Sequence, residues 1–198
     1  ETLLLRLEDL PPSLQVGHFH RNIAAALALC SLQCGVSGDI PGAIGSFPGI
    51  HHRFEFFLER RGICCVNDSA ATTPDSVCLA LGSVPPGPLV LIAGGGGSKG
   101  LDYSRMAQAV ADSVDLLVVP GNDETSGKIL EQAGDRVRWE RVKTLEEAVH
   151  TGLVYLEGRG GGTLLLSPGC SGAPVFPDLF VRGNRFKQAV RDYFRADE

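Results

Sequence analysis

The stretch LVLIAGGGGSKGLDYSRMA, residues 89–107, joins a short apolar segment to four glycines, a lysine and a segment with helical periodicity. An apolar run of this length that ends at glycines is typical of a β-strand covered on both faces. Backbone N–H groups of the glycines and the cation of Lys99 would then lie just beyond the end of that strand. The stretch predicts a strand–loop–helix unit whose loop either binds a carboxylate or phosphate or serves only as a flexible turn.

Strands and helices alternate on both sides of this glycine loop, from about residue 50 to the end of the chain. Apolar runs such as LVLIA, LLVV and TLLL suit strands inside a sheet, and helix-length connections allow those strands to run parallel. We expect strands at 54–58, 63–67, 89–93, 116–119, 137–141 and 163–166, and helices from 74 and at 103–111, 124–133, 145–155 and 178–194. The predicted fold class is α/β, a Rossmann-like, doubly wound and mostly parallel sheet of about six strands with flanking helices.

The first part of the chain has a different character. Residues 21–34 are apolar on nearly every face of a helix, which is typical of a helix buried within something larger. A second short helix is expected at 39–47, with Asp39 as its N-cap. Because these two helices do not enclose a core, we expect 1–48 to be the end of a preceding domain, 49–198 to form the α/β domain, and the chain to be a fragment.

Composition and charge disfavour several classes of function. The formal net charge of -5 provides no attraction to nucleic acid or to an anionic membrane, so we expect neither as a partner. No apolar run approaches the ~20 residues that span a bilayer, and no basic segment leads into an apolar one near the first residue, which predicts a cytoplasmic protein. The six cysteines form no CxxC pattern and the histidines have no carboxylate at ligand spacing, so we expect reduced thiols and no metal site.

Three loops at expected strand ends have unusual sequences, VNDSAATTPDS (66–76), IAGGGGSKGLD (92–102) and LLSPGCSGAPVF (165–176). Ligands of open α/β sheets bind at the carboxyl ends of strands, so a site is expected at these loops. The glycine loop is not a Walker A loop, because Gly100 rather than Ser or Thr follows Lys99. It does match GxGxxG, although no acid at the tip of the next strand is placed to bind a ribose. A freestanding dinucleotide-binding oxidoreductase module is therefore one alternative function.

Five segments, in this order along the chain, resemble motifs of the Mur ligase family and cover the chain from about residue 14 to its end. They are HFHRNIAAALAL (18–29), HHRFE (51–55), VNDSAATTP (66–74), IAGGGGSKGLDY (92–103) and LLLSPGCSGAPVFPDLFVRGNRF (164–186). The corresponding family motifs read HNxxNxxAA, PHRxE, NDSxATN or NDTxATTP, GGxxKxxDF and LLSPxxASFDxFxxFxxRGxxF. The resemblance is to the C-terminal part of the family, and within it to the members that add D-glutamate.

The resemblance implies an ATP-dependent, amide-forming ligase of the bacterial cytoplasm that adds D-glutamate to UDP-N-acetylmuramoyl-L-alanine in peptidoglycan precursor synthesis. In this family the substrate carboxylate is phosphorylated by ATP, and the amine of the amino acid attacks the acyl phosphate. The family's P-loop and Mg²⁺ ligands lie in a central domain without a counterpart here, so ATP and Mg²⁺ would be bound mainly outside this chain. We therefore expect 1–48 to be the helical remnant of that ATPase domain, 49–198 to be the amino-acid-binding domain, and the chain to be inactive alone. A non-catalytic binding module is the second alternative.

Site residues are implied position by position. For ATP, the resemblance implies that Asn22 contacts adenine, Arg53 the phosphates and Asp68 the ribose. The residues implied to bind the amino acid are Thr72, Lys99, Ser171, Gly172, Phe176 and Phe180. Lys99 would pair with the side-chain carboxylate of the amino acid, and the two phenylalanines would supply aromatic contacts. No residue of this chain is assigned a catalytic or metal-binding role.

Three positions depart from the family motifs. Phe19 stands at the first Asn of HNxxN, and Ala70 stands where many members have Lys. Gly172 replaces the serine that usually contacts the glutamate carboxylate, and Ser171 could substitute for that serine. These departures bear on affinity and on whether the amino acid is D-glutamate, L-glutamate or another acidic amino acid.

Overall fold

The structure, a computed structural model, describes residues 6, 8, 10, 14, 17–35, 39–97 and 100–196. The chain consists of two compact units, Glu1–Ile50 and His51–Glu198. This division lies close to the boundary predicted between residues 48 and 49. The assignment of the first unit to an ATPase domain stays a prediction.

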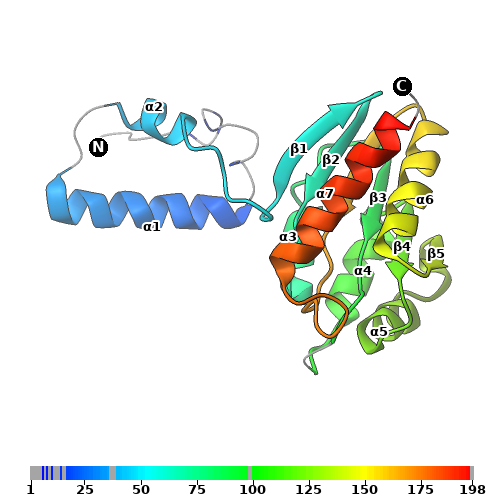
Figure 1. Ribbon diagram of the computed structural model, residues 1–198. Helices are drawn as coiled ribbons and strands as arrows, with labels where there is room; N and C mark the ends of the chain where they lie inside the picture. The colour runs from blue at the N-terminus through cyan, green and yellow to red at the C-terminus, as the bar shows by residue number, and fades with distance from the viewer. Residues whose placement is uncertain are drawn as a thin grey trace. The chain divides into compact units, whose positions relative to one another are not determined.

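In the described part of the first unit the chain forms two helices, α1 (Gly17–Cys34) and α2 (Ile40–Gly45) (Figure 1). Asp39 caps α2, because its side chain accepts a hydrogen bond from the Gly42 N–H at 2.9 Å. Within this unit α1 leaves large apolar side chains uncovered, with Leu29 64% and Leu32 85% exposed. Exposed leucines on one helix are typical of a surface that another protein segment covers.

The second unit contains the alternating elements that the sequence predicts, with helices arranged around a central sheet (Figure 1). Its strands are β1 (Glu55–Arg60), β2 (Ile63–Asn67), β3 (Leu89–Ile92), β4 (Leu116–Pro120), β5 (Trp139–Val142) and β6 (Gly162–Leu166). Its α-helices are α3 (Pro74–Leu81), α4 (Ser104–Ser113), α5 (Glu124–Ala133), α6 (Leu145–Glu157) and α7 (Leu179–Arg195). The strand expected at 137–141 starts later, because a 3₁₀ turn, η3 (Gly134–Arg136), follows α5.

The sheet has six strands in the order β1-β2-β6-β3-β4-β5. β1 runs antiparallel to β2, and all other neighbouring pairs are parallel. Helices α6 and α7 pack together on one face, and α3, α4 and α5 form the layer on the other (Figure 1). The predicted fold class, a doubly wound and mostly parallel α/β sheet, is confirmed. Because β6 lies between β2 and β3, the loop after β6 leads to a different face from the loops on either side of it. Such a switch point at the carboxyl edge is where open α/β sheets bind their ligands.

Local sequence explains how the sheet begins and why its centre is apolar. The hairpin between β1 and β2 turns at Arg61 (φ 53°) and Gly62 (φ 73°), and a two-residue hairpin turn of type I′ requires positive φ at both positions. Every residue of β3 and β4 is buried, which accounts for their uninterrupted apolar sequences. The edge strand β5 instead alternates exposed and half-buried residues.

Candidate functional site at the carboxyl edge of the sheet

Three neighbouring strands end side by side at the carboxyl edge of the sheet. The register pairs Asn67 of β2 with Leu166 of β6, and Leu166 with Ile92 of β3. Hydrogen bonds continue past these ends, from the Asp68 N–H to the Leu166 carbonyl at 2.8 Å and from the Ser167 N–H to the Ile92 carbonyl at 3.1 Å. The loops that follow the three strands therefore begin next to one another at this edge of the sheet.

The glycine loop after β3 packs directly against the loop after β6. The Gly97 N–H donates to the Ala173 carbonyl at 3.0 Å. Gly96 lies so close to Ser171 that a Cβ at position 96 would overlap the Ser171 carbonyl oxygen. The two backbones can approach this closely only because position 96 has no side chain.

The glycine loop also contacts the N-terminus of α5. The Gly95 N–H donates to Oδ2 of Asp123 at 3.0 Å, and Asp123 caps α5 through the same carboxylate. Gly94 and Gly95 have φ values of 88° and 85°, in the region that favours glycine. These contacts give the described part of the loop a defined conformation. Lys99 lies outside the described residues, so its contact with the amino acid stays a prediction.

The loop after β6 contacts both of the other loops. The Gly169 N–H donates to the Ala71 carbonyl, in the loop after β2, at 2.9 Å. The carbonyl of Gly169 in turn accepts from the hydroxyl of Tyr103, a fully buried residue, at 3.0 Å. On the other side, the Ser171 hydroxyl donates to the Gly97 carbonyl at 3.4 Å. The loop after β6 is therefore the centre of the three-loop junction.

Arg182 of α7 forms hydrogen bonds with two of these loops, the one after β2 and the one after β6. Its side chain is only 1% exposed. Nε donates to the Ser69 hydroxyl at 3.0 Å, and Nη2 donates to the carbonyls of Ser69 at 2.9 Å and Cys170 at 3.1 Å. The Ser69 hydroxyl donates onward to the Leu179 carbonyl, at the start of α7, at 2.8 Å. One buried guanidinium thus fixes the spacing between the loops after β2 and β6.

A second buried network joins residues 51–55 to β2 and α7. Glu55 accepts hydrogen bonds from Nζ of Lys187 at 2.9 Å, from the His52 N–H at 2.9 Å and from Nδ2 of Asn67 at 3.1 Å. Asn67 also donates to Nδ1 of His52 at 2.9 Å, so this ring nitrogen acts as the acceptor. Burial lowers the pKa of His52, which favours the neutral ring. A Cβ at Gly183 would overlap the His52 ring, so the glycine makes room for it.

The carboxylate of Asp68 is enclosed by the protein. Asp68 is 4% exposed, and both of its carboxylate oxygens accept hydrogen bonds. Oδ1 accepts from the Phe54 N–H at 3.1 Å, and Oδ2 accepts from the Ser167 hydroxyl at 2.8 Å. Burial raises the pKa of Asp68 to about 7, against the opposing effect of these two hydrogen bonds. Asp68 therefore changes its charge close to neutral pH.

The sequence that forms most of this domain matches a known protein family. Residues 52–170 match the family described as Mur ligase, glutamate ligase domain. The chain belongs to the Mur ligase family. The matched span begins at His52 and includes the glycine loop and the end of β6.

Similar curated relatives of this Mur ligase chain are UDP-N-acetylmuramoylalanine--D-glutamate ligases. The one from Chlorobaculum parvum is 37% identical over 186 residues, which cover 93% of this chain and 38% of the relative. The one from Pseudomonas aeruginosa is 36% identical over 179 residues, which cover 88% of this chain and 39% of the relative. This chain therefore spans less than half the length of these relatives.

Solved structures share the fold. The MurF ligase of Thermotoga maritima in complex with ADP has a TM-score of 0.67 at 15% identity, over 92% of this chain and 40% of that one. E. coli FolC in complex with ADP has a TM-score of 0.62 at 18% identity, over 86% of this chain and 40% of that one. At these identities the likeness concerns the fold alone.

Most of the predicted amino-acid contacts lie on the three-loop junction or beside it. Thr72 is half-buried in the loop after β2, and Ser171 and Gly172 lie in the loop after β6, half-buried and buried respectively. Phe176 is only 5% exposed and belongs to the hydrophobic core, whereas Phe180 on α7 is 56% exposed. Of the two phenylalanines, Phe180 offers more ring surface to a ligand. The predicted roles in amino-acid binding stay predictions for Thr72, Ser171, Gly172, Phe176 and Phe180.

The predicted ATP contacts divide between the two units. Arg53 is exposed and Asp68 is buried, both in the second unit. Asn22 is exposed on α1, in the first unit. Their roles toward the nucleotide stay predictions.

Five buried or half-buried residues were missed as parts of the site. They are His52, Glu55, Asn67, Arg182 and Lys187. The first four lie inside the HHRFE, VNDS and RGNRF segments, so the segments matched to the family motifs already included these positions. A charged residue next to glycine within the apolar face of the last helix was the further signal for Arg182. Which partners these residues contact becomes visible only in the folded chain.

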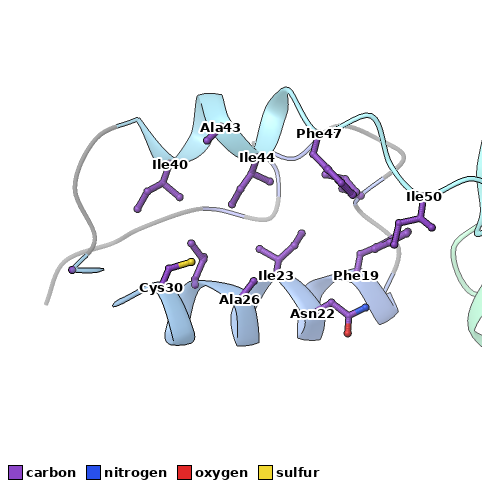
Figure 2. Close-up of a pocket in the computed structure, with 13 residues that line it drawn as sticks. Phe19, Asn22, Ile23, Ala26, Cys30, Ile40, Ala43, Ile44, Phe47 and Ile50 are labelled. Atoms are coloured by element: carbon purple, nitrogen blue, oxygen red, sulfur yellow. The ribbon is translucent and has the colours of Figure 1, made fainter. Parts of the chain in front are cut away.

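In the first unit an apolar cavity of about 510 Å³, open to solvent on one side, lies between α1 and α2. Figure 2 shows Ile23 of α1 and Ile44 of α2 pointing toward one another across it. Phe19, at one end of α1, is 3% exposed and lines the cavity, as does Asn22 on the α1 side (Figure 2). Phe19, which departs from the family motif, therefore fills an apolar position.

The described cysteines are free thiols: Cys30, Cys64, Cys65, Cys78 and Cys170. Burial raises the pKa of Cys65 to about 12 and that of Cys170 to about 11, so neither is a reactive thiolate at neutral pH. Within the described ranges, no three His, Cys, Asp or Glu side chains gather as ligands for a metal ion. In that same part of the chain, no helix has the length and apolar character needed to cross a bilayer.

The raised pKa of Asp68 predicts a pH-dependent stability. The ordinary pKa of an Asp carboxyl is about 4, and the pKa of Asp68 in the folded chain is about 7. Between these two pH values the folded chain retains a proton that the unfolded chain has released. The free energy of unfolding is therefore expected to fall as pH rises through this window, and Asp68→Asn is expected to remove this part of the slope. Urea denaturation at about pH 5 and about pH 7.5 measures the effect. Identical slopes in the variant and the unmodified chain would contradict it.

Proposed function

We propose that this chain is the C-terminal part of an ATP-dependent ligase that adds D-glutamate to UDP-N-acetylmuramoyl-L-alanine during cytoplasmic synthesis of peptidoglycan precursors. The second unit would bind the incoming amino acid, and the first unit would be the helical end of the ATPase domain. The names of the relatives that align with about nine-tenths of this chain support this activity.

The proposed reaction joins a carboxylate to an amine in two steps. A carboxylate oxygen of the UDP-sugar substrate attacks the γ-phosphorus, and ADP leaves. The amine nitrogen of D-glutamate then attacks the acyl carbon, the bond from that carbon to the phosphate oxygen breaks, and inorganic phosphate leaves as the nitrogen loses a proton. ATP supplies the phosphate leaving group, while the three-loop junction would hold the amine in line with the acyl carbon and exclude water.

The observation that carries this proposal is the hydrogen-bonded junction of the three loops. Thr72, Ser171 and Gly172 lie on two of these loops, and the glycine loop that leads to Lys99 is bonded to Ala173 at 3.0 Å. An acidic amino acid has two carboxylates, which require N–H, hydroxyl or cationic donors from more than one direction. Three loops that meet at one edge can provide donors on different sides of one small ligand.

The described residues fit part of a nucleotide site. The exposed guanidinium of Arg53 can bind phosphate oxygens bidentately, and its charge acts on the neighbouring carboxylate of Asp68. We assign Arg53 to the phosphates, Asp68 to the ribose and Asn22 to adenine. As the resemblance to the Mur ligase family implies, we assign Mg²⁺ mainly to the central ATPase domain.

The Lys99→Ala variant tests the proposed amino-acid site in the full protein that contains this chain. We expect the Michaelis constant for D-glutamate to rise about 10- to 100-fold, as for the loss of one charge-assisted hydrogen bond, with little change for ATP. Phosphate release at varied D-glutamate and ATP measures both constants. Lys143→Ala, which removes an exposed cation after β5, is the matched control and should change neither. Equal increases for both substrates in Lys99→Ala would refute the assignment.

A further inference from the structure

We infer that Glu55, Asn67 and Asp68 hold residues 51–55 in a strained conformation that presents Arg53 to the phosphates of the nucleotide. Glu55 and Asn67 would be positioning residues that act through Arg53, and Asp68 would position Arg53 through Phe54 in addition to its proposed contact with the ribose. This inference rests on the proposed function, because that function makes the nucleotide the ligand of Arg53.

The strain lies on both sides of Arg53. His52 has a φ of 64° and Phe54 has a φ of 47°, and both are bulky residues in the left-handed region that favours glycine. Such conformations cost energy and persist only where the surrounding structure enforces them, often at binding sites. Both neighbours are buried, at 4% and 1% exposure, while Arg53 between them is exposed. The backbone therefore turns its neighbours inward and leaves the guanidinium outside.

Three hydrogen bonds enforce the conformation at His52. Its N–H donates to Oε2 of Glu55 at 2.9 Å, and its ring accepts from Asn67 at 2.9 Å. Its carbonyl accepts from the Ala70 N–H at 2.8 Å. The backbone on both sides of the strained residue, and its side chain, are therefore all bonded to neighbours.

A different carboxylate enforces the conformation at Phe54. The Phe54 N–H donates to Oδ1 of Asp68 at 3.1 Å. The Phe54 ring stands edge-on to the Phe56 ring, with 5.4 Å between their centroids. Asp68 thus ties the residue after Arg53 to the loop after β2, which is the loop proposed to contact the ribose.

Glu55 has the charge needed to keep this arrangement in place. Burial raises its pKa, but hydrogen bonds from the His52 N–H and from Lys187 outweigh burial and lower the pKa to about 2. Lys187, on α7, donates to both carboxylate oxygens, at 2.9 and 3.2 Å. Because Lys187 is itself largely buried, with 12% of its side chain exposed, the pair is screened less by solvent than a surface ion pair. The strained segment is thereby anchored to the last helix.

Nucleotide binding by the full protein tests the inference without measuring activity. Calorimetry compares the non-hydrolysable ATP analogue adenylyl imidodiphosphate with AMP, which lacks the two outer phosphates. We expect Glu55→Gln to weaken binding of the analogue about tenfold and of AMP less than twofold. Arg53→Ala should show the same selectivity, because both variants act on the phosphate contact. A general loss of structure would weaken both ligands alike and would overturn the inference.

The double variant distinguishes positioning from an independent effect. If Glu55 acts through Arg53, Glu55→Gln should cause no further loss once Arg53 is alanine. Glu59→Gln, on the exposed side of the same hairpin, is the matched control and should bind both ligands normally. Additive losses in the double variant would overturn the inference and leave the proposed function standing. Failure of the unmodified protein to bind the analogue would overturn both.

Discussion

Replacement of Gly96 by alanine is expected to lower kcat/KM for D-glutamate about 100-fold in the ligase that contains this chain. Position 96 does not have a positive φ, so the backbone conformation suits alanine and the cost arises from its Cβ. That atom would overlap the Ser171 carbonyl oxygen, and the loops cannot separate without lengthening the Gly97–Ala173 hydrogen bond of 3.0 Å. A displacement of bound substrate by about 1 Å can cost about 100-fold in rate. Steady-state kinetics at varied D-glutamate measures the change.

The matched control is Gly127→Ala in α5. A Cβ at Gly127 meets nothing within 4 Å, and its φ is not positive. Alanine in a helix is favoured over glycine, so this variant should keep normal kinetics and gain about 0.5–1 kcal/mol in the free energy of unfolding. Normal kcat/KM in Gly96→Ala would mean that the close packing of the two loops has no role in amino-acid binding.

The fold class could be predicted from the sequence because its signals are local. LVLI of β3 and LLVVP of β4 are buried along their whole length, and short apolar runs of this kind favour central strands of a covered sheet. Helix starts were equally local, since Thr73 and Asp123 cap α3 and α5 through their own side chains. The strand order could not be read in this way, because the position of β6 between β2 and β3 depends on contacts between distant segments.

The site was predictable as a set of loops but not as a set of contacts. The three strand-end motifs marked the carboxyl edge, and the structure joins them through backbone hydrogen bonds such as Gly169 to Ala71 at 2.9 Å. Lys187 and Glu55 lie far apart in sequence, and nothing in either segment indicates their 2.9 Å hydrogen bond. The burial of Phe176 was also invisible, because its loop is rich in glycine and proline and has no periodicity from which to infer an inward face.

The substitution with the largest expected effect on stability is Arg182→Met, which should lower the free energy of unfolding by about 3–5 kcal/mol. Methionine preserves much of the apolar volume but leaves the buried carbonyls of Ser69 and Cys170 without the donor that now lies at 2.9 and 3.1 Å. Urea denaturation of the chain measures the loss. Arg185→Met is the matched control on the same helix: Arg185 pairs with Glu146 at 2.7 Å, but its side chain is 51% exposed, so its removal should cost less than about 1 kcal/mol. Similar losses in the two variants would show that Arg182 contributes no more than a surface charge, and that the spacing of the loops after β2 and β6 is set by their backbone hydrogen bonds alone.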